Sequence, residues 1–101
     1  MRYFVIGDED TVLGLGMAGV AGAVAVSADD AQRALSAAFA DTTIGIIIIT
    51  ERIADLARAT VDKYIFTRQF PLIVEIPDRR GPAAGRKSLR ETINAAIGVK
   101  L

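Results

Sequence analysis

Apolar runs that predict strands alternate along this chain with segments whose apolar positions recur at helical spacing. The strongest run is Ile44–Thr50, in which four consecutive isoleucines follow Gly45. An apolar run without alternation is typical of a strand buried on both faces, at the centre of a parallel sheet covered by helices. Shorter runs predict strands at residues 3–6, 23–26 and Leu72–Ile76. Because Glu75 interrupts the last run, we expect that strand to expose one face at a sheet edge.

The segments between these runs predict helices that begin at polar residues. Asp8, Glu9 and Asp10 can cap a helix over residues 11–18 and place negative charge at its amino end. Ser27 and Asp30 have the spacing of a capping box and open a helix over residues 29–40. Thr50 is expected to cap one continuous helix that extends to Tyr64. The expected apolar faces are Ala31, Ala34, Leu35, Ala38 and Phe39 in the one helix, and Ile53, Leu56, Ala57, Thr60, Val61 and Tyr64 in the other.

This alternation of strands and helices predicts an α/β fold. Four strands connected by helices form a small four-stranded parallel sheet flanked by helices, in a three-layer arrangement of the Rossmann-like or flavodoxin-like type. Residues 78–85 are rich in Arg, Gly, Pro and Ala and have no hydrophobic period, so they indicate a linker. The chain therefore divides into an α/β domain over residues 1–78 and a linker with a carboxyl-terminal helix over residues 79–101.

The predicted carboxyl-terminal helix opens with the capping box Ser88-Leu-Arg-Glu91 and ends near Gly98. Its apolar positions lie on one side at helical spacing. They are Leu89, Ile93, Ala96 and Ile97. The pattern allows this helix either to cover the sheet or to reach out to a partner, and the sequence leaves both open.

Composition excludes several kinds of chemistry. The 101 residues are 51% hydrophobic, enough for a packed core, and include neither cysteine nor histidine. Zinc fingers, thiol redox pairs and Ser-His or Cys-His nucleophile systems are therefore excluded. We expect no catalytic residues, no metal and no cofactor.

The net charge is zero, but basic residues gather near the carboxyl terminus. They are Arg79, Arg80, Arg86, Lys87 and Arg90. No aromatic residue lies among them, so the cluster favours a solvated face or an acidic protein partner over nucleic acid. The uncharged stretch over residues 11–27 is too short and too rich in Ala and Gly to span a membrane, and its glycines Gly19 and Gly22 predict a turn. A soluble protein is expected.

Two local motifs suggest chemistry that their positions do not support. Gly14, Gly16 and Gly19 match the G-x-G-x-x-G pattern of dinucleotide binding, but Gly14 lies seven residues beyond Gly7, inside the predicted helix. In that motif the glycines must form the turn directly after the strand, so that pyrophosphate reaches the amino end of the helix. Close packing of the helix on the sheet through small residues is the favoured interpretation.

The acidic run Asp8, Glu9 and Asp10 resembles the paired carboxylates with which two-component receiver domains hold magnesium. Those domains also need an Asp at the end of the third strand and a Lys after a later one. The third predicted strand instead ends in Thr50-Glu51, and the fourth is followed directly by Pro77-Asp78-Arg79, without a lysine. Helix capping is favoured, and a receiver-like signalling domain using this acidic corner is the alternative function.

Three ordered segments, at residues 5–20, 46–54 and 71–78, resemble the F subunit of the V-type/A-type ATPases. They read Val-Ile-Gly-Asp-Glu-Asp-Thr-Val-Leu-Gly with a following Ala-Gly-Val, then Ile-Ile-Ile-Ile-Thr-Glu-Arg-Ile-Ala, then Pro-Leu-Ile-Val-Glu-Ile-Pro-Asp. The resemblance implies a small α/β domain with a flexible carboxyl-terminal segment, without catalytic activity of its own, on the rotary central stalk. The chain departs from the family's pattern at Gly16-Met17, where bulkier or charged residues are more usual.

The same resemblance implies the partners and their contacts. The partners would be the coiled coil of the D subunit and the catalytic A/B head of the assembled complex, with no nucleic acid and no direct membrane insertion. Residues 86–101 correspond to the family's tail. The implied contacts with the D subunit are the apolar Leu89, Ile93, Ala96 and Ile97 and the basic Arg79, Arg80 and Arg90. The expected role is to couple ATP hydrolysis or synthesis to ion transport, cytoplasmic and peripheral to the membrane, with a tail that regulates hydrolysis.

Overall fold

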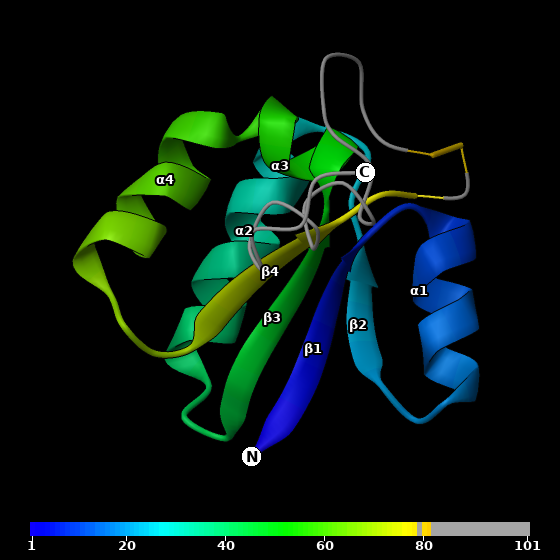
Figure 1. Ribbon diagram of the computed structural model, residues 1–101, viewed down its shortest axis with the longest axis horizontal. Coiled ribbons are helices and arrows are strands. Elements are labelled where there is room, and N and C mark those ends of the chain that lie inside the picture. Colours follow the sequence, from blue (N-terminus) through cyan, green and yellow to red (C-terminus); the bar gives the residue numbers. More distant parts are fainter. Residues whose placement is uncertain (79, 82–101) are drawn as a thin grey trace, which may run out of the picture.

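Four parallel strands form one sheet in the order β2-β1-β3-β4, with helices on both of its faces (Figure 1). The computed structural model describes residues 1–78, 80 and 81. Its elements are β1 (Arg2–Gly7), α1 (Glu9–Met17), β2 (Ala21–Val24), α2 (Ala28–Ala40), β3 (Ile44–Thr50), α3 (Glu51–Leu56), α4 (Arg58–Thr67) and β4 (Leu72–Ile76). The predicted α/β fold with a four-stranded parallel sheet is therefore confirmed.

The isoleucine strand β3 lies in the middle of the sheet, as its sequence predicts. Ile46 pairs with Tyr3 of β1 on one side and with Leu72 of β4 on the other. The ends of β3 and β4 are those expected. Both β2 and β4 are edge strands.

Strand β2 begins two residues earlier than predicted, because Gly22 belongs to the strand rather than to a turn. Gly22 pairs with Val5, and a side chain at this position would clash with the carbonyl oxygen of Val5, 2.7 Å from the place of its Cβ. The turn before β2 is formed at Gly19, whose φ of 91° is readily adopted only by glycine. The small residues of β2 thus let α1 and β1 approach closely.

The main core lies between the sheet and the layer of α2, α3 and α4. The apolar face predicted for α2 is confirmed, since Ala31, Ala34, Leu35 and Ala38 are buried there. The largest fully buried side chains are Ile6, Leu35, Ile47, Ile49, Val5, Val61 and Thr50. Stacking of Phe39 on Tyr64, with ring centroids 4.0 Å apart, joins α2 to α4. The opposite face of the sheet is covered by α1, which packs over β1 and β2.

The prediction of one continuous helix from Thr50 to Tyr64 is wrong. The segment forms two helices, α3 and α4, which are separated at Ala57. Ala57 has φ −121° and ψ 37°, outside the helical region. No proline or glycine is present to cause this break. Ile53 and Val61 are both buried in the core, and Arg58, the first residue of α4, points towards Glu75 of β4.

The prediction that Thr50 caps this helix is correct in position, but the expected hydrogen bond from its side chain is absent. Thr50 occupies the N-cap position of α3, but its side chain makes no capping hydrogen bond. The side chain turns instead towards Gly7 of β1, and its Oγ1 is buried without a hydrogen-bond partner in the described part of the chain. By contrast, Ser27 caps α2 as predicted, accepting a hydrogen bond from the backbone of Asp30 at 3.1 Å.

Candidate functional site

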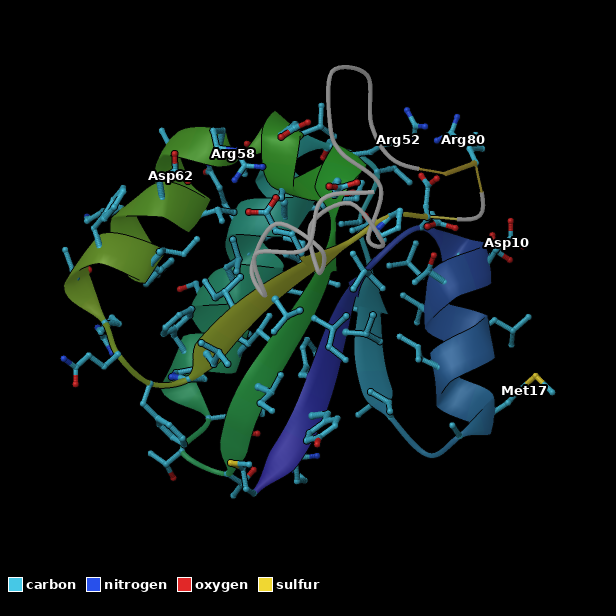
Figure 2. The ribbon with its side chains drawn as sticks, viewed as in Figure 1. Asp10, Met17, Arg52, Arg58, Asp62 and Arg80 are labelled. Atoms are coloured by element: carbon cyan, nitrogen blue, oxygen red, sulfur yellow. The ribbon has the colours of Figure 1, made fainter. Side chains whose placement is uncertain are left out.

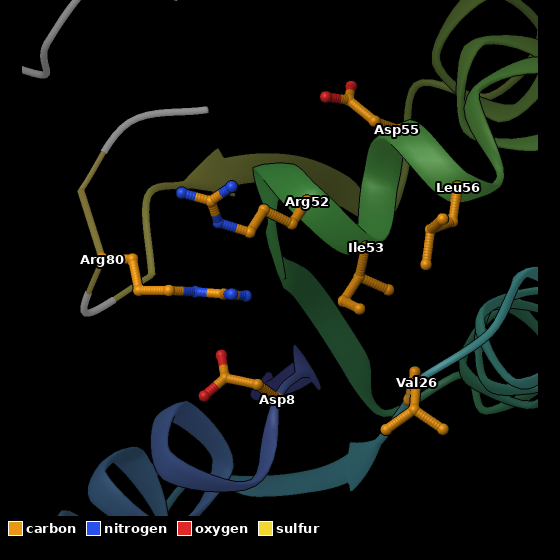
Figure 3. Close-up of a pocket in the computed structure, with 8 residues that line it drawn as sticks. Asp8, Val26, Arg52, Ile53, Asp55, Leu56 and Arg80 are labelled. Carbon is orange, nitrogen blue, oxygen red and sulfur yellow. The ribbon is translucent and has the colours of Figure 1, made fainter. Parts of the chain in front are cut away.

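A hollow of the described domain lies at the carboxyl edge of the sheet. From β1 the chain passes to β2 on one side and afterwards to β3 on the other, so the connections leave β1 and β3 in opposite directions. In open α/β sheets this switch point creates a crevice at the carboxyl ends of the strands. A cleft of about 570 Å³ lies there (Figure 3). Its lining residues are Asp8, Ala25, Val26, Arg52, Ile53, Asp55, Leu56 and Arg80.

Asp8 stands where β1 ends and acts as the N-cap of α1. Its Oδ2 accepts a hydrogen bond from the backbone N–H of Thr11 at 3.1 Å, and its Oδ1 accepts one from the hydroxyl of Thr11 at 2.6 Å. Partial burial opposes ionisation, but these hydrogen bonds outweigh it and hold the pKa of Asp8 below its ordinary value. The capping role predicted for the acidic run is thereby confirmed for Asp8.

The remainder of the acidic corner does not form a cation site in the described residues. Glu9 and Asp10 are exposed in the first turn of α1, and no group of three carboxylates among residues 1–78, 80 and 81 is arranged to hold a metal. A smaller hollow of about 260 Å³ beside them is lined by Asp8, Glu9, Asp10, Asp78 and Arg80. The guanidinium of Arg80 brings positive charge to the place where a divalent cation would have to bind.

A buried carboxylate lies against the two guanidinium groups that line the cleft. Asp78, just after β4, has a side chain only 3% exposed, and its Oδ2 lies 2.8 Å from Nε of Arg52 and 3.5 Å from an amino nitrogen of Arg80. Oδ1 of Asp78 accepts a hydrogen bond from the backbone N–H of Arg80 at 2.9 Å. The contact with Arg52 is a charge contact and not a hydrogen bond, because its Nε–H does not point at the carboxylate.

The glycines of the dinucleotide-like motif have no such role in this fold. Gly14 and Gly16 lie within α1, well past the turn after β1, so the geometry that binds pyrophosphate is absent from the described chain. The packing role expected for them is also wrong. A Cβ at Gly14 or Gly16 would meet no atom within 4 Å, so both glycines face outwards, next to the exposed Leu13 and Met17. Met17 is seen projecting from the end of α1 in Figure 2.

The structure describes one of the residues for which partner contact was expected. Arg80 lies at the cleft, near Arg52 (Figures 2 and 3). The others lie outside the described residues: Arg79, Leu89, Arg90, Ile93, Ala96 and Ile97. Sequence reasoning missed Arg52, Val26 and Leu56. Their positions in the sequence could have indicated the cleft. Arg52 follows β3 by two residues and Val26 follows β2 by two, so both lie at the carboxyl edge of a parallel sheet.

In the described residues, no helix has the length and apolar character needed to cross a membrane. The longest helix, α2, has 13 residues.

Comparison with known proteins identifies the family. The sequence profile of the family described as the ATP synthase (F/14-kDa) subunit matches residues 4–93. The chain belongs to this family. Membership confirms the resemblance that the three ordered sequence segments indicated, and the match includes most of the residues beyond the described domain.

Curated relatives in this family match along nearly their whole length. The A-type ATP synthase F subunit of Thermococcus kodakarensis is 37% identical over 106 residues, covering 100% of this chain and 98% of the relative. That of Methanothermobacter thermautotrophicus is 36% identical over 99 residues, covering 96% and 92%. That of Pyrococcus furiosus is 36% identical over 106 residues, covering 100% and 98%.

A solved structure supports the fold independently. The crystal structure of the V-type ATP synthase F subunit of Archaeoglobus fulgidus superposes with a TM-score of 0.57 at 20% identity, covering 74% of this chain and 95% of that one. The four-stranded parallel sheet with flanking helices is thus an arrangement found in this family.

Proposed function

We propose that this chain is a non-catalytic subunit of the central stalk of an A-type/V-type ATP synthase, bound to the coiled coil of the D subunit. The observation that carries the proposal is the match to an A-type ATP synthase F subunit along the full length of the chain at 37% identity. It is supported by the described site, where Asp8 serves as a helix cap and the Asp78 carboxylate is held by arginines. Neither carboxylate is placed as an acid, base or nucleophile.

The proposed contact with the D subunit is the segment over residues 79–101. Its apolar positions at helical spacing would pack along one helix of the coiled coil, and its arginines would pair with acidic residues beside that stripe. The contact residues are Leu89, Ile93, Ala96 and Ile97, with Arg79, Arg80 and Arg90. Residues 1–78 then form the body that holds this segment.

In this role the protein transmits torque rather than making or breaking bonds. It would stiffen the rotor between the catalytic A/B head and the membrane sector, so that ATP hydrolysis or synthesis stays coupled to ion transport. A tail that moves relative to the body would alter the rate of hydrolysis. Such a protein acts in the cytoplasm, peripheral to the membrane and attached to it through the complex.

Co-purification with the D subunit of the same complex tests the proposal. The full-length chain should form a stable complex, and the double substitution Ile93→Asp/Ile97→Asp should weaken it, because both changes place charge on the apolar stripe. Ile93→Asp and Val99→Asp are compared as single substitutions for the matched control, since each adds one negative charge to an apolar residue and Val99 lies outside that stripe. Failure of the full-length chain to bind the D subunit would contradict the proposed function.

The regulatory role has a separate readout. ATP hydrolysis by the assembled complex should change when the wild-type chain is replaced by Ile93→Asp/Ile97→Asp and stay unchanged with Val99→Asp. Equal hydrolysis rates with all three forms would contradict regulation by the tail and leave the stalk role to the binding experiment.

A further inference from the structure

One half of a sheet face has no helix over it in the described part of the chain. Helix α1 packs on β1 and β2, and Figure 1 shows it near β2 and away from β4. Val5 of β1 points to the face that α1 covers, since a side chain placed at Gly22 would meet both Val5 and Val12 of α1. The register neighbours of Val5, Ile48 on β3 and Val74 on β4, lie on the same face. This face is therefore open over β3 and β4.

The side chains of this open half-face are apolar. Leu72 and Val74 are 56% and 38% exposed, although they belong to a strand of the sheet. Sheets in which all strands are parallel normally have both faces covered, and the isoleucine run of β3 is apolar on both of its faces. We therefore expect a cover over the half-face, which consists of Ile46, Ile48, Leu72, Val74 and Ile76.

The segment that can supply this cover follows β4 directly in the chain. Residues 82–101 lie outside the described part, and they begin a few residues after the end of β4 at Ile76. The sequence predicts a helix from Ser88 to near Gly98. At 1.5 Å per residue this helix would be about 16 Å long, and the five residues of β4 also span about 16 Å. The predicted helix is thus long enough to cover the strand from end to end.

The apolar stripe of the predicted helix also has the spacing of β4. Leu89, Ile93 and Ile97 recur every four positions, which corresponds to a rise of about 6 Å along a helix. Residues on one face of a strand recur every two positions, or about 6.6 Å. A helix that runs back over β4 would therefore match the two rows one to one. The expected pairs are Leu89 with Ile76, Ile93 with Val74, and Ile97 with Leu72.

We propose that residues 88–98 dock on the open half-face of their own chain when the D subunit is absent, and so complete the cover of the sheet. The inference rests on the proposed function, because the D subunit is taken to bind the same apolar stripe. One stripe cannot pack on the sheet and on the coiled coil at the same time, so docking and binding compete. Docking then lowers the affinity for the D subunit in proportion to the fraction of free molecules that are docked.

Crosslinking within the full-length chain tests the docking itself. The sequence contains no cysteine, so two introduced cysteines report on one pair of positions without further changes. A short bismaleimide should join Val74→Cys/Ile93→Cys within one chain. It should not join Leu13→Cys/Ile93→Cys, whose first site lies on the exposed surface of α1. An excess of the D subunit should suppress the first crosslink. Equal crosslinking of the two pairs would overturn the docking.

Calorimetry with the D subunit tests the competition. Leu72→Glu places a charge on the open half-face at an exposed position, and Leu13→Glu is its matched control on α1. Leu72→Glu should lower the dissociation constant, by about tenfold if about nine free molecules in ten are docked. The control should bind as the wild-type chain does. Thermal melting confirms that both variants are folded.

The direction of the change identifies what covers the half-face. Weaker binding by Leu72→Glu would show that the partner covers it, and unchanged binding would show that the tail does not compete. Either result would overturn the inference and leave the stalk role intact. Failure of the wild-type chain to bind the D subunit would instead contradict the proposed function, while the crosslinking of the free chain would still decide the docking.

Discussion

Arg58 on α4 and Glu75 on β4 are joined by two parallel hydrogen bonds, from Nη1 to Oε2 at 2.7 Å and from Nη2 to Oε1 at 2.8 Å. The same guanidinium donates to Asp55 and Asp62, so it is surrounded by three carboxylates. Hydrogen bonding to Glu75 raises the pKa of Arg58 above its ordinary value despite the opposing effect of burial. One side chain thus fixes the edge strand to the helix layer.

Replacing Arg58 by alanine should lower the free energy of unfolding by about 2 kcal/mol, because Glu75 loses both of its guanidinium donors. Arg33→Ala removes a single exposed pair with Asp30 and should cost less than about 0.5 kcal/mol. Urea denaturation of the two variants compares these costs directly. Equal unfolding midpoints would mean that the Arg58 cluster adds no more than a surface ion pair does.

Gly14→Ala and Gly22→Ala should change stability in opposite directions. Gly14 is inside α1 with open space around its missing Cβ, so alanine should stabilise the domain by about 0.5–1 kcal/mol. At Gly22 the new Cβ would clash with the backbone of Val5, so alanine should destabilise the domain. Thermal unfolding measures both effects. Destabilisation by Gly14→Ala would show that the helix needs glycine there.

Stability should fall in acid as Asp8 is protonated. Its pKa in the folded protein lies below the ordinary 3.8, so its contribution is complete above about pH 5. The contribution decreases as pH falls towards 3.8 and is lost as pH passes through the lower, folded-state pKa. Asp8→Asn keeps an acceptor but not the charge, and should be about 0.5 kcal/mol less stable than wild type at pH 7. The two proteins should converge once the pH falls below the folded-state pKa of Asp8, whereas a gap independent of pH would exclude the charge as its cause.

Thr50→Val should stabilise the protein by about 1 kcal/mol, because it replaces a buried hydroxyl that has no partner in the described residues with a methyl group of similar volume. Thr50→Ala should instead destabilise it, since it leaves a cavity beside Gly7. Chemical denaturation of both variants separates the polar effect from the packing effect. A loss of stability in Thr50→Val would indicate that the hydroxyl has an acceptor.

Much of the fold could be predicted from the local pattern of apolar and polar residues, because the strands are strongly apolar and the helices begin at polar capping residues. The isoleucine run located β3 and its central place, and Ser27 located the start of α2. The break at Ala57 had no local signal, since it depends on how two helices meet the core and on a pairing with β4. Glu75 led to the correct prediction that β4 is an edge strand. Its own side chain, however, is covered by Arg58 rather than exposed.

The candidate site was harder to predict than the fold. Arg80 was singled out as one of a basic cluster, but its neighbour at the cleft, Arg52, comes from another segment and belongs to no motif. Val26 was expected inside a strand, and it lies two residues beyond the end of β2. Residues that become neighbours through the order of strands carry no shared spacing in the sequence. Only the topology brings them together.

The central position of β1 has a consequence for how the chain folds during synthesis. Tyr3 must pair with Ile46, so one side of β1 stays open until the ribosome has released β3. Pairing between such distant segments is slow, because a long loop must close before any contact forms. The nascent amino-terminal half therefore passes through a stage in which an apolar strand awaits its neighbour, and this is the stage at which a chaperone would act.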